Sequence, residues 1–487
     1  MLRCYRMSLR GNLLTLITGA VHERSARGIA AAVSRLVTAG RLPGGTRLPT
    51  VRDVARELGV SPTTVSEAWQ SLLRAGAIQT RGRSGTFVAA RPRQRLRYAQ
   101  MGGPALYKTA PGAWSSAPRG GTGWMDLSTG VPDHDLLPEL ADALRRIGAH
   151  RRSLSGPTSY LDAPVLPALE DALRARLPLR PEQITVVDGA LDALDRITAA
   201  VVRFGDHVLV EDPAFPPMLD LLEATGAEVI GVPLDRAGLD TGGLPDLLDE
   251  FRPVALYLQP RAHNPTGVSM THERAAALSR ILADHPDLVV IEDDHAGDIA
   301  SAPAVSLGAF RPSQVVHVSS FSKSHGPDLR LAAVAGPASL VSAVADRRLL
   351  GPGWSSRLLQ AVLLDLLEDP AAIATVDAAR AEYARRRECL RTALARQGVT
   401  AGAADGINLW FPVADQQYAM VTLAAHGVAV APGAPFRVTP GGGEHVRVTA
   451  GLVRDGFDDL ASILASAAGS AQRGSGSRTH AHPRGWR

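Results

Sequence analysis

The chain of 487 residues contains almost no lysine, because Lys108 and Lys323 are the only two among its 52 Lys and Arg residues. Cysteine is equally scarce. Cys4 and Cys389 are too far apart to suggest a disulfide framework or a metal cluster, and they indicate a reducing cytoplasm. No apolar run approaches the ~18–20 residues needed to cross a bilayer. With 45% hydrophobic and 21% charged residues, the composition excludes a wholly disordered or collagen-like chain. The length is sufficient for more than one domain of roughly 150 residues.

The first twenty residues superficially resemble a secretory leader. Three arginines precede a short apolar stretch that ends in Thr18-Gly19-Ala20. Because the apolar stretch is too short for a leader, we interpret residues 1–20 as an N-terminal extension of a cytoplasmic protein. Both Met1 and Met7 are candidate start residues.

Positive charge is concentrated near the front of the chain. Residues 21–97 contain fourteen arginines but only four acidic residues, Glu23, Asp53, Glu57 and Glu67. Since the whole chain has a net charge of only +4, the rest of it is net acidic. This asymmetry favours a front end that binds a polyanion, although a solvated charged surface would give the same count.

The pattern in this basic segment predicts a helix-turn-helix. Apolar residues recur at helical spacing over residues 25–39, and Thr50 is a candidate N-cap of a second helix. A turn at Gly59 leads to Ser61, the predicted N-cap of a third helix with Pro62 at its first position. Residues 77–80 and 86–88 can then pair as strands around a basic wing.

The run from Ala39 to Val88 resembles the GntR-type winged helix-turn-helix over its whole length. The resemblance implies that the third helix enters the major groove of double-stranded DNA. Arg is common in relatives where this chain has Pro62 and Ser66, so phosphate contacts are better supported than direct reading of guanine. By resemblance, the residues that contact DNA are Arg47, Arg52, Ser61, Thr63, Thr64 and Ser66, with Arg81 and Arg83 in the wing.

These patterns divide the chain into five parts. We predict an extension (1–20), a winged-helix domain (21–90), a linker (91–123), an α/β body (124–468) and a disordered tail (469–487). The linker and the tail are rich in Gly, Ser and Arg. In the body, short β-branched runs alternate with helical stretches, which predicts a mostly parallel sheet covered by helices. The predicted strands are 184–187, 207–210, 228–232, 255–259, 288–291, 315–319 and 332–335.

Lys323 follows one of these strands, at the edge of the sheet where ligands of such folds bind. A lysine amine can lose its proton and attack a carbonyl, whereas a guanidinium remains charged. In a chain that otherwise uses arginine, this lysine is therefore a candidate nucleophile. The alternative is a surface lysine that persists by chance.

Other strand ends contain the groups that a pyridoxal phosphate site needs. Asp293, next to Asp294, could pair with a pyridine nitrogen, and Asn264 in "HNPTG" could bind the phenolic oxygen. Gly189 and Ala190 open a helix whose N-terminus suits a phosphate. Phe215 could stack on the ring.

Together these motifs resemble the aspartate-aminotransferase superfamily of fold type I, over residues 124–468. The resemblance implies that Lys323 links covalently to pyridoxal 5'-phosphate, that Asp293 faces the ring nitrogen, and that Arg447 binds a substrate carboxylate. It also implies a head-to-tail homodimer in which Tyr160 reaches the phosphate of the partner subunit. The remaining implied phosphate ligands are Ser320, Ser322, Arg330 and the Gly189 turn.

The cofactor shell departs from the family at several positions. His295 replaces the usual tyrosine, and it could still donate to the phenolic oxygen. Asp188 stands where relatives have serine, which puts a carboxylate beside the phosphate turn. Near Tyr160, Val165 and Leu169-Glu170 replace the family's glycine and "LR".

A winged helix in front of such a body resembles the MocR branch of GntR regulators, which includes PdxR- and GabR-like proteins. The resemblance implies a transcriptional regulator whose body binds pyridoxal phosphate, or an amino compound, as effector. The alternative is a working aminotransferase that carries a DNA-binding domain. The intact winged helix and the altered cofactor shell favour the regulator, because a sensor needs binding but not turnover.

Overall fold

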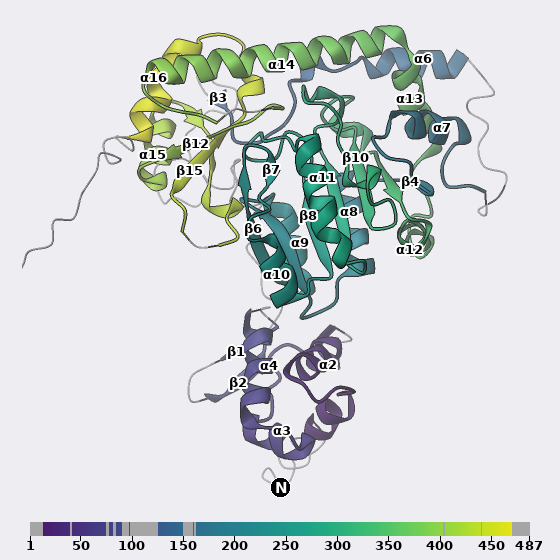
Figure 1. The fold of residues 1–487 in the computed structure, drawn as a ribbon, viewed down its shortest axis with the longest axis vertical. Coiled ribbons are helices and arrows are strands. Elements are labelled where there is room, and N and C mark those ends of the chain that lie inside the picture. The colour runs from purple at the N-terminus through teal and green to yellow at the C-terminus, as the bar shows by residue number, and fades with distance from the viewer. Residues whose placement is uncertain are drawn as a thin grey trace, which may run out of the picture.

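The computed structural model of the chain describes residues 13–38, 41–74, 77–80, 84–89, 97, 125–149, 159, 162–402, 405–439 and 441–469. Several predictions concern residues outside these ranges: Arg81, Arg83, Lys108, Tyr160, and most of the expected linker and tail. Figure 1 shows a small purple N-terminal unit beneath a larger body.

The N-terminal unit is a winged helix-turn-helix, as predicted. Its core collects apolar side chains from every element, including Ile29, Val54, Trp69 and Val88. Ile17, in a helical segment at residues 13–19, is fully buried in the same core, so the apolar residues of the predicted extension pack with this unit. The elements are α2 (Ala26–Thr38), α3 (Val51–Leu58), α4 (Pro62–Arg74), β1 (Ile78–Thr80) and β2 (Thr86–Val88), and the two strands pair antiparallel.

Both predicted helix caps of this unit are present. The Thr50 side chain accepts a hydrogen bond from the Asp53 amide at 3.2 Å, and Ser61 Oγ accepts one from the Thr64 amide at 3.1 Å. Each bond satisfies an amide that has no partner within its own helix. Gly59 ends α3 at a positive φ of 68°, the left-handed conformation that glycine adopts without strain.

The body is built around an eight-stranded sheet of order β4-β11-β10-β9-β8-β5-β6-β7. The central pairs from β10 to β6 are parallel, while β11 runs antiparallel to both of its neighbours and β7 runs antiparallel to β6. The mostly parallel sheet is therefore confirmed, and the predicted strand ends shift by at most three residues. The strands are β4 (Gln183–Val187), β5 (His207–Asp212), β6 (Glu228–Asp235), β7 (Gly238–Leu239), β8 (Ala255–Leu258), β9 (Val289–Asp294), β10 (Val315–Ser320) and β11 (Ala332–Gly336).

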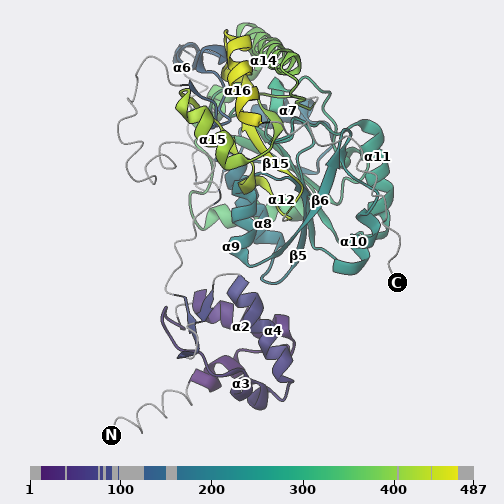
Figure 2. The same ribbon diagram turned by 90° about the vertical axis from the view of Figure 1, so that its left-hand side faces the viewer.

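Helices cover both faces of this sheet. Figure 2 shows α8, α9 and α12 on one side of β5 and β6, with α10 and α11 on the other. Val208 and Val210 pack in the first layer, whereas Leu209 between them packs in the second. Burial on both faces explains why the strands read as continuous apolar runs. The helices are α8 (Ala190–Val201), α9 (Pro216–Thr225), α10 (Leu244–Phe251), α11 (His272–Ile281) and α12 (Ala338–Leu349).

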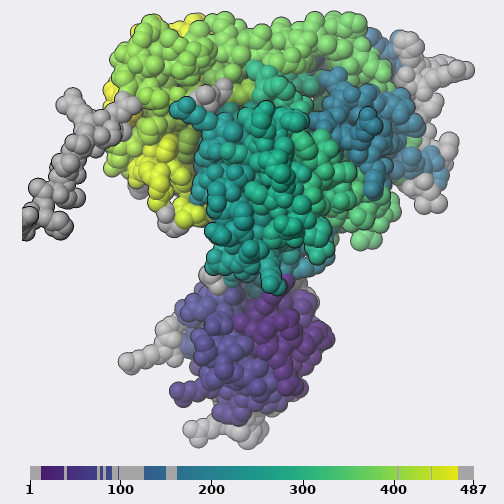
Figure 3. Space-filling view, in the orientation of Figure 1, coloured from purple at the N-terminus to yellow at the C-terminus, as the bar shows by residue number. Residues whose placement is uncertain are grey.

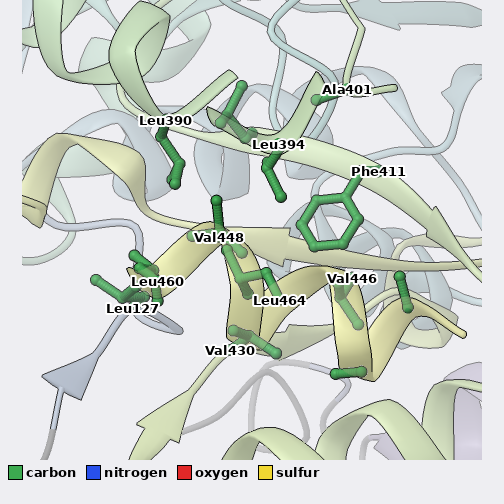
Figure 4. Packing of buried hydrophobic residues seen from close by; sticks show 14 of the residues in the cluster. Leu127, Leu390, Leu394, Ala401, Phe411, Val430, Val446, Val448, Leu460 and Leu464 are labelled. Atoms are coloured by element: carbon green, nitrogen blue, oxygen red, sulfur yellow. The ribbon is translucent and has the colours of Figure 1, made fainter. Parts of the chain in front are cut away.

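A second, smaller sheet lies toward the C-terminus, with strand order β12-β15-β14. Figure 4 shows its apolar face packed against α14 and α16, where Phe411, Val446 and Val448 meet Leu394 and Leu464. The strands are β12 (Leu409–Val413), β14 (Ala431–Pro432) and β15 (Glu444–Val448), and a separate parallel pair joins β3 (Met125–Asp126) to β13 (Val428–Ala429). The helices are α6 (Leu140–Ala149), α7 (Pro167–Arg176), α13 (Arg357–Glu368), α14 (Pro370–Arg396), α15 (Gln416–Ala425) and α16 (Phe457–Ala468).

Short 3-10 turns occupy several connections of the body. They are η3 (His134–Leu136), η5 (Leu282–Asp284), η6 (Gly297–Ile299), η7 (Leu307–Ala309), η8 (Pro327–Leu329), η9 (Ala434–Phe436) and η10 (Ala450–Leu452). Of these, η8 begins four residues after Lys323, and η9 lies beside the buried Arg447. Among the described residues, no helix is long and apolar enough to cross a membrane.

The winged helix touches the body at the loop between α8 and β5. Phe204 packs against the core of the winged helix, and Arg27 of α2 forms an ion pair with the buried carboxylate of Asp206. Figure 3 shows the purple unit resting against the teal part of the body at this place. An apolar contact and an ion pair therefore join the two units.

Candidate functional site

The strand register brings the predicted site residues to one edge of the large sheet. Ser319 of β10 lies opposite Asp294 of β9, and Ser320 lies opposite Ala332 of β11, which in turn faces Val187 of β4. The segments that leave these strands therefore start side by side. They contain Lys323 and the Gly189 turn, and Asp293 lies within the last two residues of β9.

Lys323 points at His295. Its Nζ lies 2.7 Å from His295 Nδ1 and 3.3 Å from the His295 carbonyl oxygen. His295 Nε2 lies 3.0 Å from the Ala262 carbonyl oxygen, which can only accept, so Nε2 carries the proton and Nδ1 accepts from Lys323. The imidazole is thus held as a neutral acceptor for the amine.

Burial sets the protonation of both groups. It lowers the pKa of Lys323 to about 8; the charge of Asp293 opposes this shift and that of Arg447 adds to it. Burial also holds the pKa of His295 well below its ordinary value, with a further lowering from the charge of Lys323. A lysine with a lowered pKa beside a neutral histidine supplies unprotonated amine near neutral pH, as a nucleophile requires.

Asp293 and Asp294 have different roles although they are adjacent. Asp294 accepts hydrogen bonds from Arg261 and from the Gly297 amide, so it holds structure together. Asp293 accepts one bond, from Gln259 Nε2 at 2.7 Å. Its other oxygen, Oδ1, is buried and has no partner among the described residues. Burial raises the pKa of Asp293 to about 6, with the Gln259 bond and Lys323 opposing the shift.

Gln259 is a site residue that the sequence analysis did not identify. Besides its bond to Asp293, its side-chain oxygen accepts from the Asn264 amide at 2.8 Å. It therefore couples the carboxylate to the "HNPTG" turn. Its position between β8 and that turn was the available signal, but a lone glutamine is not distinctive in sequence.

Asn264 and Arg447 form a second buried pair. Arg447 Nη1 donates to Asn264 Oδ1 at 3.0 Å, and Nη2 donates to the Ser128 carbonyl oxygen. The guanidinium carbon lies 5.2 Å from the centre of the Phe436 ring. Gly130 leaves room for it, because a Cβ there would lie 3.2 Å from both terminal nitrogens. The side-chain amide nitrogen of Asn264, Nδ2, thereby remains available to donate to a ligand.

The turn before α8 forms a backbone cup. Gly189 has φ of 101° and caps a helix whose first residue is Ala190. The positive φ favours glycine, and a Cβ there would lie 2.7 Å from Arg330 Nη2, so the guanidinium would have to shift. Arg330 Nη2 also donates to the Asp188 carbonyl oxygen at 3.1 Å. Open amides and a guanidinium at a helix N-terminus suit a phosphate.

Ser320 and Ser322, two further predicted phosphate ligands, lie at the end of β10 and on the segment that follows it. Ser320 Oγ is 3.4 Å from the Ser322 amide, on the segment between β10 and Lys323. The Asp188 carboxylate does not face the cup. It lies 3.2 Å from Arg348 Nη2 and 2.5 Å from Ser355 Oγ.

Phe215 is the N-cap residue of α9, directly after β5, and it is half-buried against the sheet. Its ring-stacking role remains a prediction. Tyr160 lies outside the described residues.

These residues fit pyridoxal phosphate. The buried free oxygen of Asp293 matches a protonated ring nitrogen, and the amine of Lys323 matches an aldehyde. The Gly189 cup with Arg330 matches a phosphate.

The winged helix presents the residues predicted to contact DNA on its surface. Arg47, Arg52, Ser61, Thr63 and Ser66 are exposed and Thr64 is half-buried. In addition to its capping bond, Ser61 Oγ lies 2.8 Å from Thr64 Oγ1. At least part of the role of Ser61 is therefore structural. Arg47 lies next to Gly85 at the wing, where a Cβ would be 3.0 Å from its Nε.

Comparison with known proteins agrees with this two-part architecture. The family of aminotransferases of class I and II matches residues 122–464, and the bacterial regulatory proteins of the gntR family match residues 25–88. The chain belongs to the class I and II aminotransferase family and is a GntR-type regulator of the MocR branch. As a member of this branch, it is a transcriptional regulator with an aminotransferase-like body.

Similar proteins extend along most of the MocR-type chain. The vitamin B6 salvage pathway transcriptional repressor PtsJ of Salmonella typhimurium is 34% identical over 441 residues, which cover 89% of this chain and 96% of that protein. The HTH-type transcriptional regulator TauR of Rhodobacter capsulatus is 31% identical over 454 residues, covering 83% and 88%. The crystal structure of LysN, an α-aminoadipate aminotransferase from Thermus thermophilus, has a TM-score of 0.65. At 24% identity over 71% of this chain and 92% of that one, it shows the fold of the body alone.

Proposed function

We propose that this regulator binds double-stranded DNA through its winged helix and takes pyridoxal 5'-phosphate as its effector in the body. The observation that carries the proposal is the buried Asp293 Oδ1, which lacks a partner within the described part of the chain and lies in the site of Lys323. Such a carboxylate oxygen is costly unless a ligand pairs with it. The similarity to PtsJ, a vitamin B6 salvage pathway transcriptional repressor, supports an effector of this class.

Each residue of the site has a role in this proposal. Lys323 would bind the aldehyde carbon, Asp293 would pair with the ring nitrogen, and Asn264 would donate to the phenolic oxygen, with His295 as the neighbour of Lys323. When bound, pyridoxal phosphate supplies an electron-withdrawing ring to an attached amine. The residues proposed to bind the phosphate and the ring face are Gly189, Ala190, Ser320, Ser322, Arg330, Phe215 and, from a partner subunit, Tyr160.

The neutral His295 distinguishes this site from one with tyrosine. Its Nδ1 accepts a hydrogen bond from Lys323 Nζ, and the ring cannot supply a phenolic hydroxyl. Arg447 is proposed to bind the carboxylate of an amino compound, which would exchange the Asn264 bond for a ligand bond. These features suit a binding site at least as well as a turnover site, in agreement with a regulator.

The DNA contacts are proposed to follow the usual winged-helix geometry. Arg47 and Arg52 contact phosphates, and the start of α4 enters the major groove with Thr63, Thr64 and Ser66. Arg81 and Arg83 act in the wing. We further propose that the protein acts in the cytoplasm as a head-to-tail homodimer. Leu349 and Leu350, 66% and 91% exposed at the end of α12, are apolar surface that a second copy could cover.

The cofactor proposal is tested by the visible absorbance band of lysine-bound pyridoxal. We expect the wild-type protein to show the band with pyridoxal phosphate and Lys323→Arg to lack it, because a guanidinium cannot attack the aldehyde. Lys108→Arg is the matched control, since it changes the one other lysine of the chain, and should retain the band. A band in Lys323→Arg, or none in the wild type, would refute the proposal. Sustained keto acid formation from an amino donor would instead favour the enzyme.

A further inference from the structure

A fully buried arginine lies behind the phosphate cup. Arg348, near the end of α12, is 1% exposed, and its guanidinium contacts two carboxylates of the α8 N-terminus. In sequence, nothing distinguishes it from Arg347, the neighbouring arginine of α12. Its contacts explain how this chain tolerates its departure at Asp188.

The α8 N-terminus has two acidic residues where an anion is expected. Asp188 precedes the cup glycine, and Asp192 lies in the first turn of the helix. Asp192 Oδ2 also accepts from the Asp188 amide at 3.1 Å, so both carboxylates lie close to Gly189. Backbone amides at a helix N-terminus attract a phosphate, but free carboxylates beside them repel it.

Arg348 binds both of these carboxylates from the buried side. Its Nη1 lies 3.0 Å from Asp192 Oδ2 and its Nη2 lies 3.2 Å from Asp188 Oδ2. Ser355 completes the arrangement, because Nη2 donates to its Oγ at 3.1 Å and that Oγ lies 2.5 Å from Asp188 Oδ1. Arg196 binds the outer side of Asp192 at 2.9 Å.

The carboxylate and the backbone carbonyl of Asp188 therefore bind different arginines. Its carboxylate is held toward Arg348, while its carbonyl oxygen accepts from Arg330 Nη2, which lies at the cup. Arg348 thus fixes Asp188, whose carbonyl oxygen accepts the hydrogen bond from Arg330. It also neutralises charge that would otherwise face the phosphate.

We infer that Arg348 is a positioning residue of the phosphate site, which turns Asp188 away from the cup and lets an anion bind beside two acidic residues. The inference rests on the proposed binding of pyridoxal phosphate. In this arrangement the charge of Asp188 is compensated by Arg348, which lies 160 positions later in the chain. Arg348 itself does not touch the cofactor.

The test compares pyridoxal phosphate with pyridoxal, which lacks the phosphate, in equilibrium binding to the full-length protein. We expect Arg348→Met to weaken the binding of pyridoxal phosphate about tenfold and to leave the binding of pyridoxal unchanged. Asp188→Ser in the Arg348→Met background should restore most of the loss. Asp188→Ser alone should increase the affinity for pyridoxal phosphate severalfold, because it removes a carboxylate and leaves Arg348 in place.

The outcomes separate this inference from the proposed function. Equal weakening of both ligands, or no rescue in the double variant, would show a merely structural role and overturn the inference. If Arg348→Met does not fold, Asp188→Ser decides: an unchanged ratio of the two affinities overturns the inference. If the wild type binds neither ligand, the proposed function fails instead.

Discussion

At the scale of single residues, Asp293 and Lys323 set each other's charge in a buried site. Burial raises the pKa of the acid to about 6 and lowers that of the amine to about 8. Each group favours the charged form of the other, which keeps both shifts smaller than burial alone would produce. Near neutral pH the carboxylate is therefore mostly ionised, while a fraction of the amine is neutral and reactive.

The rate at which the protein captures pyridoxal phosphate should rise with pH through a midpoint of about 8. Neutral amine is the attacking form, and its fraction increases until the pH passes the pKa of Lys323. Stopped-flow absorbance over a pH series measures this rate. A midpoint near the ordinary lysine value of 10.5 would contradict the buried environment described here.

Asp293→Asn should change stability and binding in opposite directions. A pKa raised from 3.8 to about 6 means that folding favours the protonated acid, so the ionised form destabilises the native state increasingly as pH rises between those values. Near neutral pH the amide should raise the free energy of unfolding by about 1–3 kcal/mol, because it removes a buried charge. The same substitution should weaken the binding of pyridoxal phosphate about tenfold or more, since the ring nitrogen loses its ionised partner.

Thermal unfolding without ligand and equilibrium binding measure the two effects of Asp293→Asn. Glu292→Gln is not a suitable control, because Glu292 is itself buried and bonded to His317. Asp287→Asn, which changes an acidic residue just before β9, should alter neither quantity. A loss of stability in Asp293→Asn without weaker binding would assign Asp293 to structure alone.

Sequence could identify the residues whose type is unusual, but not those whose partners are distant. Lys323 stands out because lysine is nearly absent, and Asp293 and Asn264 come directly or shortly after apolar runs that predict strands. Gln259 and Arg348 have common types, and their roles arise only when β8 meets β9 and when α12 packs beside α8. The orientation of Asp188 depends on the same packing.

At the scale of elements, sequence located the helices of the winged-helix unit more closely than the ends of the strands of the body. Caps at Thr50 and Ser61 are local signals and both are present. The strand predicted at 288–291 instead continues to Asp294, because neighbouring strands pair with it beyond the apolar run. Polar residues can extend a strand in this way when tertiary partners satisfy them, as Gln259 and Arg261 do.

Ser61 and Thr63 at the start of α4 should respond differently to replacement by alanine. Ser61→Ala removes the cap and should cost about 1 kcal/mol of winged-helix stability, with weaker DNA binding. Thr63 is exposed, so Thr63→Ala should leave stability unchanged and weaken only DNA binding. Thermal unfolding and DNA titration distinguish the two. Equal stability in both variants would contradict the capping role of Ser61.

At the scale of the whole molecule, the contact at Phe204 and Arg27 offers a route by which the body could influence the winged helix. Phe204 packs on the core of the small unit, while Asp206, two residues later, binds Arg27. Arg27 is 57% exposed, so the ion pair adds little and the apolar contact carries most of the attachment. The loop between α8 and β5 thereby connects the winged helix to the helix that starts at the phosphate cup.

Phe204→Ala should therefore loosen the winged helix from the body. Because the segment between them contains many arginines, trypsin should cut it faster in this variant than in the wild type. Phe310→Ala changes a phenylalanine 36% exposed elsewhere on the body and should leave the rate unchanged. Equal cutting of all three proteins would show that Phe204 does not attach the unit.

The central claim is that the body binds pyridoxal phosphate and that this binding changes the affinity of the winged helix for DNA. The most direct measurement is protection of the gene's own upstream DNA by the wild type and Lys323→Arg, with and without pyridoxal phosphate. We expect protection by both proteins. The ligand should change wild-type affinity by about fivefold or more and leave Lys323→Arg unaffected. No protection in any state would contradict the regulator, and identical protection with and without ligand would contradict pyridoxal phosphate as its effector.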